Sequence, residues 1–468
     1  MFRCTRCSHT FDTRSLTPVC ERCGGAVLIE SARRPSVSRR GLENLPSGVW
    51  RYRVFLPHLP PEEVVTLGEG GTPLLRAERL GGELGLRNLM IKDETRNPTG
   101  SFMDRGTTVL VSLARHAGVR GYSCDTTGNL GASLAAYCAK AGVKAHIRVN
   151  PNTDQGKLFQ MLAYGAELDT TSSAGWRGGS LEVTAANPYL MEGEKTTGYE
   201  IVQDLEWKIP DVVVVPVGTG GHLSMVWRAF RQLEEAGVIG ALGCRLVGVK
   251  LGQADSSARV QAPIGLPLAE LAESEPYFRE EAAKAIEESH GLSIPTTSGE
   301  TISATGLLAK TEGIFAEPSA ASVVAGLSRA VKSGLVGRDE SVVCVITGAG
   351  LKDTRSVSRI AKETRRIAPS TSYASPSPRI GETKTSIMRL LRRPGYAYQL
   401  WTTLGGRKEI STASVYQHLA ELEDMALIRK RGSEVFRGRE RIMYELTKRG
   451  TDYLRITGRL ERASQILP

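Results

Sequence analysis

Four cysteines near the amino terminus have the spacing of a metal site. Cys4 and Cys7 form one Cys-x-x-Cys pair, twelve residues intervene, and Cys20 and Cys23 form a second pair. Two such pairs folded over one zinc ion supply four thiolates, which leaves no open position for water and makes the metal structural. Two reactive or disulfide pairs are the alternative interpretation. The paired spacing favours a zinc ribbon over residues 1–30, whose fold would depend on the metal.

Two glycine-containing segments have the composition of anion-binding turns. The turn Gly218-Thr219-Gly220-Gly221 follows the apolar run 212–215 and opens a helical stretch. Glycines let the backbone turn tightly and point N–H groups at a phosphate, while the helix dipole favours negative charge. The segment Thr126-Thr127-Gly128 lies likewise between a short strand and the helix expected at 131–141, where it could hold a carboxylate. Alone, each turn is more often structural than a binding site.

Residues 97–106 read Asn-Pro-Thr-Gly-Ser-Phe-Met-Asp-Arg-Gly. With the strand residues before it, this decapeptide resembles the lysine-bearing segment of threonine synthase, a fold type II enzyme dependent on pyridoxal phosphate. In that family the residue after the phenylalanine is a lysine, whose amine forms the Schiff base and shuttles protons. Met103 stands in that place, and a thioether can do neither. Methionine matches lysine in length and flexibility, so the pocket can stay packed without its reactive group.

Further segments repeat this resemblance in the family's chain order. It implies that Gly218, Thr219, Gly220 and Gly221 cup the cofactor phosphate, and that Thr126, Thr127 and Gly128 hold the substrate carboxylate. It also implies that Asn129 bonds the ring oxygen and Thr347, in 345–353, meets the pyridine nitrogen. Segments 193–200 and 315–322 match as well. Because Met103 touches neither the phosphate cup nor the ring contacts, pyridoxal phosphate is expected to bind without a covalent link.

Lys92 is another amine near the altered position. The family pattern makes it a strand residue near the substrate's acidic groups, and therefore a possible substrate contact. Its recruitment as Schiff-base donor is disfavoured, because an amine displaced by about 1 Å loses much of the rate. A salt bridge with Glu94 or Asp93 is the structural alternative. For Met103 itself, an engineered replacement that silences an enzyme is a further interpretation.

The length of 468 residues suggests roughly three units at one per 100–200 residues. From 45 to 368, short apolar runs alternate with amphipathic helical stretches, which predicts an α/β fold with a parallel sheet in two subdomains. The resemblance implies the fold type II, tryptophan synthase β-like arrangement there. Residues 369–383 form a Pro/Ser-rich linker. Residues 384–468 follow as a separate domain.

The last domain has the element order of a winged helix. Helices are expected over 384–393 and 396–404, and a third begins with Ser411 as N-cap and buries Val415, Leu419 and Leu422. Residues 429–446 read as two strands around a basic loop, and a last helix begins near Thr447. This order resembles the winged helix-turn-helix of PadR-like transcription factors.

In such a domain the third helix enters the major groove and the wing touches the DNA backbone. Base contacts are expected from Thr412, Ser414, Gln417 and His418. Phosphate contacts are expected from Arg429, Lys430, Arg437, Arg439 and Arg441. The alternative is a winged helix used only for protein contacts, with the arginines as a solvated rim. The aromatic residues are expected in core and dimer packing: Tyr396, Tyr398, Trp401 and Tyr416.

The net charge of +10 lies at the two ends of the chain. Residues 1–45 hold 8 Lys and Arg against 4 Asp and Glu, residues 379–468 hold 18 against 10, and the remainder holds 34 against 36. Basic ends suggest a polyanionic partner. Four single cysteines in apolar segments (Cys124, Cys138, Cys244 and Cys344), with no signal peptide and no apolar run long enough to span a membrane, indicate a reduced, cytoplasmic protein.

Two functions remain. The first is a transcriptional regulator, in which a threonine-synthase-like domain without its nucleophile senses pyridoxal phosphate, an amino acid or O-phosphohomoserine and controls DNA binding. The second is a threonine synthase that converts O-phosphohomoserine and water to threonine and phosphate, with an accessory winged helix. Met103 favours the regulator, and the otherwise intact motifs favour the enzyme. We favour the regulator, as a homodimer that reads two half-sites about one helical turn apart.

Overall fold

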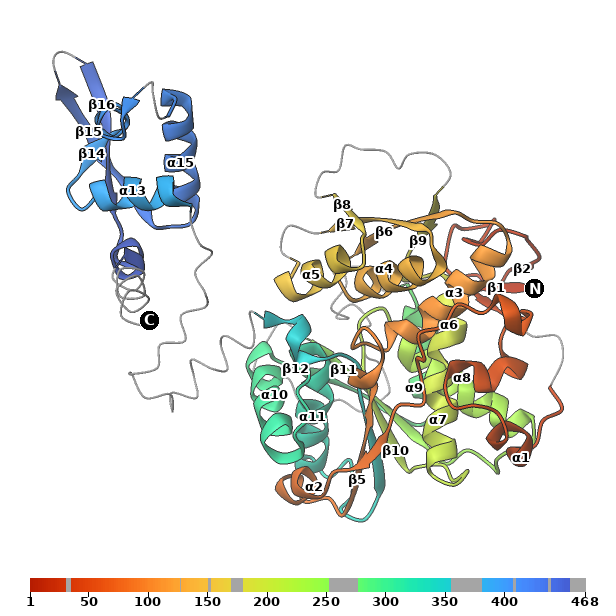
Figure 1. Ribbon diagram of the computed structural model, residues 1–468. Coiled ribbons are helices and arrows are strands. Elements are labelled where there is room, and N and C mark those ends of the chain that lie inside the picture. The colour runs from red at the N-terminus through yellow and green to blue at the C-terminus, as the bar shows by residue number, and fades with distance from the viewer. Residues whose placement is uncertain are drawn as a thin grey trace, which may run out of the picture. The chain divides into compact units, whose positions relative to one another are not determined.

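The structure is a computed structural model of the chain (Figure 1). The chain forms two compact units, residues 1–365 and 366–468. The residues described are 1–30, 35–126, 128–149, 153–169, 180–251, 277–354, 381–406, 410–436 and 439–454. The expected Pro/Ser linker falls outside these ranges except for its last three residues.

The larger unit is built on a six-stranded sheet. Its strands in spatial order are β12 (Leu292–Thr296), β11 (Arg245–Leu251), β10 (Val212–Pro216), β13 (Ser341–Ile346), β5 (Asn88–Asp93) and β4 (Leu74–Arg76). All neighbours are parallel except β4, which pairs antiparallel with β5. Along β10, Val212 and Val214 enter one core while Val213 and Val215 enter the other. A strand buried on both faces is apolar throughout, as its sequence is.

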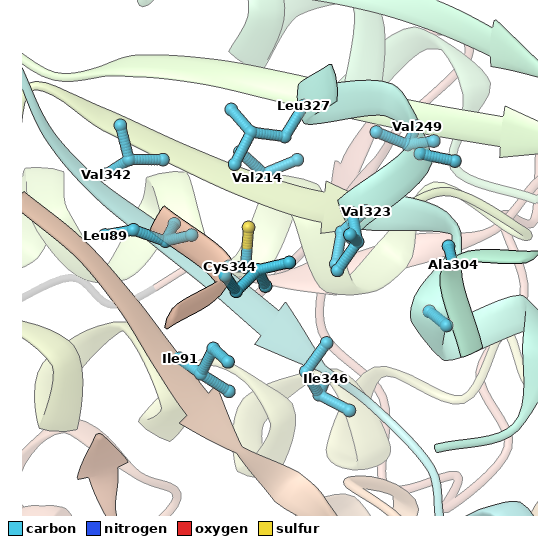
Figure 2. Close-up of a cluster of buried hydrophobic side chains, with 14 of the residues drawn as sticks. Leu89, Ile91, Val214, Val249, Ala304, Val323, Leu327, Val342, Cys344 and Ile346 are labelled. Atoms are coloured by element: carbon cyan, nitrogen blue, oxygen red, sulfur yellow. The ribbon is translucent and has the colours of Figure 1, made fainter. Parts of the chain in front are cut away.

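Helices cover both faces of this sheet (Figure 1). The core on one face includes residues of α2 (Glu78–Leu84), α10 (Ser298–Glu312) and α11 (Pro318–Lys332), and Figure 2 shows part of it, with Ile346 and Cys344 of β13 near Val323 of α11. The core on the other face includes residues of α7 (Thr196–Asp204), α8 (Gly221–Glu235) and α9 (Arg279–Glu288), together with α1 (Arg39–Glu43) and the 3-10 helix η1 (Val49–Phe55).

A second, four-stranded parallel sheet completes the two-subdomain core. Its order is β8 (Glu167–Asp169), β7 (Lys144–Val149), β6 (Gly121–Thr126) and β9 (Leu181–Val183). Its core includes residues of α3 (Met103–His116), α4 (Asn129–Ala141), α5 (Gln155–Ala163) and α6 (Pro188–Glu194). Short 3-10 turns lie at η2 (Pro61–Glu63), η3 (Glu94–Arg96) and η5 (Gly350–Lys352). The expected parallel-sheet α/β core is confirmed.

The amino-terminal segment is a three-stranded antiparallel sheet of β1 (Phe2–Cys4), β2 (Thr10–Phe11) and β3 (Val27–Ile29). It packs on the larger unit through three polar contacts. Arg3 pairs with Glu281 of α9 at 3.0 Å, Asn187 donates to the Leu16 carbonyl at 2.8 Å, and Arg228 of α8 donates to the Ile29 carbonyl. This segment therefore belongs to the body of the larger unit.

The smaller unit contains α13 (Glu382–Leu390), α14 (Ala397–Thr403), α15 (Thr412–Asp424), β15 (Ile428–Phe436) and β16 (Arg439–Leu446), and residues 448–454 are helical. The Ser411 side chain accepts from the Ser414 N–H, and Val415, Leu419 and Leu422 are buried, which confirms the expected cap and apolar face. The first helix ends at Leu390, three residues earlier than expected, ahead of Pro394, which disfavours helical geometry in the residue before it.

One element of this unit was not expected. The short strand β14 (Gly395–Tyr396) pairs with β16, so the wing is a three-stranded sheet.

Within the described residues of the whole chain, no helix combines the length and the hydropathy that a membrane span needs.

Candidate functional site

The residues expected to bind the cofactor stand where parallel strands end and helices begin. Met103 is the first residue of α3, Asn129 of α4 and Gly221 of α8, while Thr347 directly follows β13. Strands β10 and β13 belong to the six-stranded sheet, and β6, which leads to Asn129, belongs to the four-stranded one. In parallel α/β proteins, ligands bind outside the carboxyl ends of the strands.

Polar contacts join these segments into one site. The Phe102 N–H donates to the Thr347 carbonyl at 3.1 Å, and Ser101 forms an isolated β-bridge with Gly348. The Asn129 Nδ2 donates to Glu317 Oε1 at 2.7 Å across 188 positions of sequence. Glu317 is buried against Gly348, where an added Cβ would overlap its carboxylate. The Met103, Asn129 and Thr347 segments therefore meet around Glu317.

The glycine turn before α8 has the form of a phosphate cup. Gly220 has a φ of 85°, which favours glycine, and a Cβ there would stand 2.8 Å from the Phe278 carbonyl oxygen. A Cβ on Gly221 would stand 2.6 Å from Met191 Sδ, whereas Gly218 has nothing within 4 Å. The turn is thus packed behind Gly220 and Gly221 and open at Gly218. It lies at the start of a 15-residue helix, whose dipole favours an anion.

His222, the second residue of α8, enters the same site. Its ring stacks on Phe102, with centroids 4.2 Å apart, and its Nε2 lies 3.1 Å from Thr197 Oγ1. Burial lowers the pKa of His222 to about 4, and the nearby Arg105 adds to the shift, so the ring is neutral at pH 7. Its Nδ1 has no hydrogen-bond partner among the described residues.

The polar groups of these residues fit pyridoxal phosphate. The open Gly218 turn suits the phosphate, and Asn129 Oδ1 and His222 Nδ1 are buried polar atoms without partners in the described chain, as expected where a polar ligand binds. Met103 is partly exposed and brings no amine. Of the carboxylate loop, Thr126 accepts from the Gly128 N–H at 3.0 Å, and Thr127 lies outside the described residues.

Lys92 lies in strand β5, as expected, but its ammonium has other partners than the sequence suggested. Its side chain is fully buried, and its ammonium donates to the Thr72 carbonyl at 2.6 Å. It also pairs with Glu200 at 2.9 Å and Asp204 at 2.8 Å, so the expected salt bridge with Glu94 or Asp93 is wrong. The ammonium has three protons and three partners, which leaves none for a substrate or an aldehyde.

Glu200, which pairs with Lys92, also pairs with Arg105 near the start of α3. Together with Glu94 these residues form a buried ion network. Arg105, fully buried, bonds Glu94 through Nε at 2.6 Å and Glu200 through Nη2 at 2.7 Å. Burial by itself would raise the pKa of Glu94, but the Arg105 guanidinium holds it below its ordinary value. Arg105 is two residues beyond Met103, so the network holds Met103 in place.

The four amino-terminal cysteines come together as expected for a metal site. The Sγ atoms of Cys4, Cys7, Cys20 and Cys23 all lie within 4.8 Å of one another. The arrangement is compatible with one zinc ion, to which four thiolates would give a closed tetrahedral site. The other four cysteines are buried and free: Cys124, Cys138, Cys244 and Cys344.

Helix α15 presents the expected base-reading residues unequally. Thr412 and Gln417 are exposed, whereas Ser414 and His418 are half-buried and lie 3.4 Å apart through Oγ and Nε2. Gln417 donates to Glu421 at 3.0 Å. Tyr416 and Tyr398 are both half exposed, so neither lies in the core, and their expected part in dimer packing stays a prediction.

The expected phosphate contacts partly carry internal partners. Arg429 pairs with Glu445 at 2.6 Å and Lys430 with Glu423 at 2.9 Å, although both cations are more than half exposed. Arg441 stacks over the rings of Tyr396 and Tyr398, 5.8 Å from each. Arg437 and the side chain of Arg439 lie outside the described residues.

Three residues of this site had no role assigned from the sequence: Glu317, His222 and Lys157. Glu317 lies in a segment quoted for the resemblance, and His222 follows the glycine turn, but neither spacing nor composition marks their contacts. Lys157 of α5, which reaches Glu317 at 3.4 Å, had no sequence signal.

Comparisons with known proteins agree with this architecture. Residues 65–348 match the family of pyridoxal-phosphate dependent enzymes, and residues 387–456 match the transcriptional regulator PadR-like family. The first match spans more than half of the chain, which therefore belongs to the pyridoxal-phosphate-dependent enzyme family and also carries a PadR-like domain.

Its relatives in that family include threonine synthases. The chain is 36% identical to the threonine synthase of Methanocaldococcus jannaschii, over 78% of this chain and 96% of that protein. It is 34% identical to the threonine synthase of Methanosarcina acetivorans, over 77% and 94%. Among solved structures, the processed form of threonine deaminase isoform 2 from Solanum lycopersicum has a similar fold, with a TM-score of 0.51, 20% identity, and coverage of 72% of this chain and 98% of that one.

Proposed function

We propose that this protein is a ligand-sensing, DNA-binding transcriptional regulator. Its larger unit would bind pyridoxal phosphate or an amino-acid ligand in a threonine-synthase-like site that lacks the family's lysine. The observation that carries the proposal is Met103, the first residue of α3, beside an otherwise well-formed phosphate cup and in one chain with a PadR-like domain. A site that keeps its binding groups and loses its nucleophile is suited to sensing.

Each binding group has a part in this proposal. The open turn at Gly218 and the start of α8 would hold a phosphate, and Asn129 and Thr347 would orient a ring between the two sheets. Thr126, Thr127 and Gly128 would receive a carboxylate, which selects amino acids or phosphorylated amino acids. Bound pyridoxal phosphate would supply an electron-poor aldehyde and ring, and a lysine would be needed to move protons at the amino acid and to release the product.

The PadR-like unit would bind DNA in response to the ligand. Thr412 and Gln417 are exposed on α15, as base reading needs, and the basic residues of β15 and β16 would contact phosphates. Binding as a homodimer would place two such helices on half-sites about one helical turn apart. A selection of bound sequences from random DNA, repeated with and without pyridoxal phosphate or O-phosphohomoserine, tests this response. Absence of any preferred sequence in all conditions would refute it.

A threonine synthase with an accessory domain is the second candidate. The relatives named threonine synthase favour it, because they match over nearly their whole length. Phosphate release from O-phosphohomoserine with added pyridoxal phosphate separates the two candidates when this chain and its Met103→Lys variant are compared. We expect no turnover by the chain and measurable turnover by the variant. Turnover by the unmodified chain would make it an enzyme.

A further inference from the structure

Other amines lie beside the segments of the candidate site, although Met103 has no amine and the ammonium of Lys92 is fully bonded. Lys352 and Lys157 both have contacts with the segments of the site. They differ in what their ammonium groups touch, and that difference decides which of them could meet an aldehyde.

The ammonium of Lys352 is hydrogen-bonded within the protein. Its Nζ donates to the Thr99 carbonyl and to Gln160 Oε1, each at 2.8 Å. Burial lowers its pKa to about 8, although Asp104 and Glu317 oppose the shift. The first bond holds the loop that precedes Met103, and the second joins Lys352 to α5. Moving this amine toward a ligand would leave the Thr99 carbonyl without that donor.

Lys157 instead extends over Gly128 toward Glu317. Its stem crosses the carboxylate loop so closely that a Cβ on Gly128 would overlap its Cδ. Its Nζ lies 3.4 Å from Glu317 Oε2, and the other oxygen of that carboxylate accepts from Asn129 Nδ2 at 2.7 Å. One carboxylate therefore separates the Lys157 amine from the side chain that would bind the cofactor's ring oxygen.

The chemistry of the cofactor makes this placement informative. In pyridoxal phosphate the aldehyde and the ring hydroxyl are on adjacent carbons. A ring whose hydroxyl bonds Asn129 would carry its aldehyde on the adjacent carbon, and the flexible four-carbon stem of Lys157 ends at the carboxylate that Asn129 also bonds. We propose that Lys157 is the amine that captures pyridoxal phosphate in this chain, in place of the family's lysine.

The step balances without an oxidant or a reductant. The Lys157 ammonium gives one proton to the facing carboxylate of Glu317. The free amine attacks the aldehyde carbon, the carbon–nitrogen double bond forms, and the carbonyl oxygen leaves as water. Lys157 binds covalently here, where Met103 by itself suggested noncovalent binding only.

Capture of pyridoxal phosphate by Lys157 would affect the binding of an amino acid at the carboxylate loop. Lys157 lies over Gly128, in the loop that would receive an amino acid's carboxylate. An aldehyde held by Lys157 and an amino acid held by this loop would compete for one space. The proposal rests on the proposed function and deepens it, because it makes pyridoxal phosphate the captured effector and amino acids its competitors.

The test is borohydride reduction of the full-length chain after incubation with pyridoxal phosphate, followed by peptide mapping by mass spectrometry. We expect a near-stoichiometric adduct on the peptide that contains Lys157. The exposed Lys140 of α4 reports background labelling of surface amines. Lys157→Arg keeps a cation opposite Glu317 but cannot form an imine, so this variant should show only background labelling.

A second variant tests whether loss of labelling in Lys157→Arg reflects the missing amine or a damaged binding site. Adding Met103→Lys to Lys157→Arg restores the family's arrangement and should move the adduct to position 103. The proposal is overturned by an adduct on Lys352, by labelling of Lys157 no higher than of Lys140, or by failure of the double variant to form any adduct. Sequence-specific DNA binding is measured separately, with and without ligand, so its absence in all conditions would refute the regulator and leave the lysine assignment standing.

Discussion

Replacing Arg105 with methionine tests whether the buried ion network holds the cofactor loop. The guanidinium is fully buried and bonds two buried carboxylates, Glu94 and Glu200. Removing one partner of a buried pair costs about 3–5 kcal/mol, because the remaining charge is left without compensation. Lys92 still pairs with Glu200 in the variant, so Glu94 is the group that loses its cation. We therefore expect the free energy of unfolding to fall by about 3–5 kcal/mol.

The pH dependence of this loss gives a sharper test. Burial alone would raise the pKa values of Glu94 and Glu200, but Arg105 holds both below their ordinary values. A carboxyl whose folded pKa is depressed contributes stability above its unfolded pKa, and that contribution disappears as the pH falls through the folded pKa. The difference between the chain and Arg105→Met should thus be largest at pH 7 and shrink at lower pH, because the uncompensated Glu94 of the variant, whose pKa burial raises, takes up a proton before the paired Glu94 of the chain does.

Urea unfolding followed by tryptophan fluorescence measures the difference at each pH. Adding Glu94→Gln to Arg105→Met removes the uncompensated charge and should recover part of the loss, which a double-mutant cycle quantifies. Arg87→Met is the matched control, since Arg87 pairs with Asp339 on the exposed surface at 2.7 Å and should matter little. A loss below about 1 kcal/mol at pH 7, or a loss that does not change with pH, would refute the reasoning.

Three further predictions concern other parts of the molecule. The folded pKa of His222, about 4, is lower than the unfolded value near 6.5, so stability should decline as the pH falls between these values; His222→Gln should flatten that decline, and an unchanged profile would contradict the assignment. If the four cysteines hold zinc, its removal by a chelator should raise hydrogen exchange in β1 and β3, in α8 around Arg228 and in the first turn of α9, because Arg3 and Arg228 join these elements; exchange confined to the ribbon would argue against this coupling. Gln417→Ala should change the preference among DNA sites, whereas Arg437→Ala with Arg439→Ala should weaken binding to all sequences and reduce the salt slope by roughly one per residue; equal effects of both changes would contradict the groove assignment.

The sequence alone was sufficient for the features that depend on neighbouring residues. Chain order and local spacing were enough for the pyridoxal-phosphate family, the PadR-like domain and the cysteine cluster. The unbroken valine run of β10 indicated a strand buried on both faces, and Ser411 marked the start of α15. These signals are local, because backbone turns, caps and strand burial leave their pattern within a few positions.

The contacts that decide the chemistry appeared only in the tertiary structure. Lys92 was assigned to Glu94 or Asp93 by proximity in sequence, but it pairs with Glu200 and Asp204, more than 100 positions away. The approach of Lys157 to Glu317, and of His222 to Phe102, also depends on how two sheets and their helices pack together. A sequence pattern states which residue types follow one another, whereas packing decides which of them meet. The sequence therefore showed a methionine at position 103, and the fold placed Lys157 beside Glu317 and Asn129.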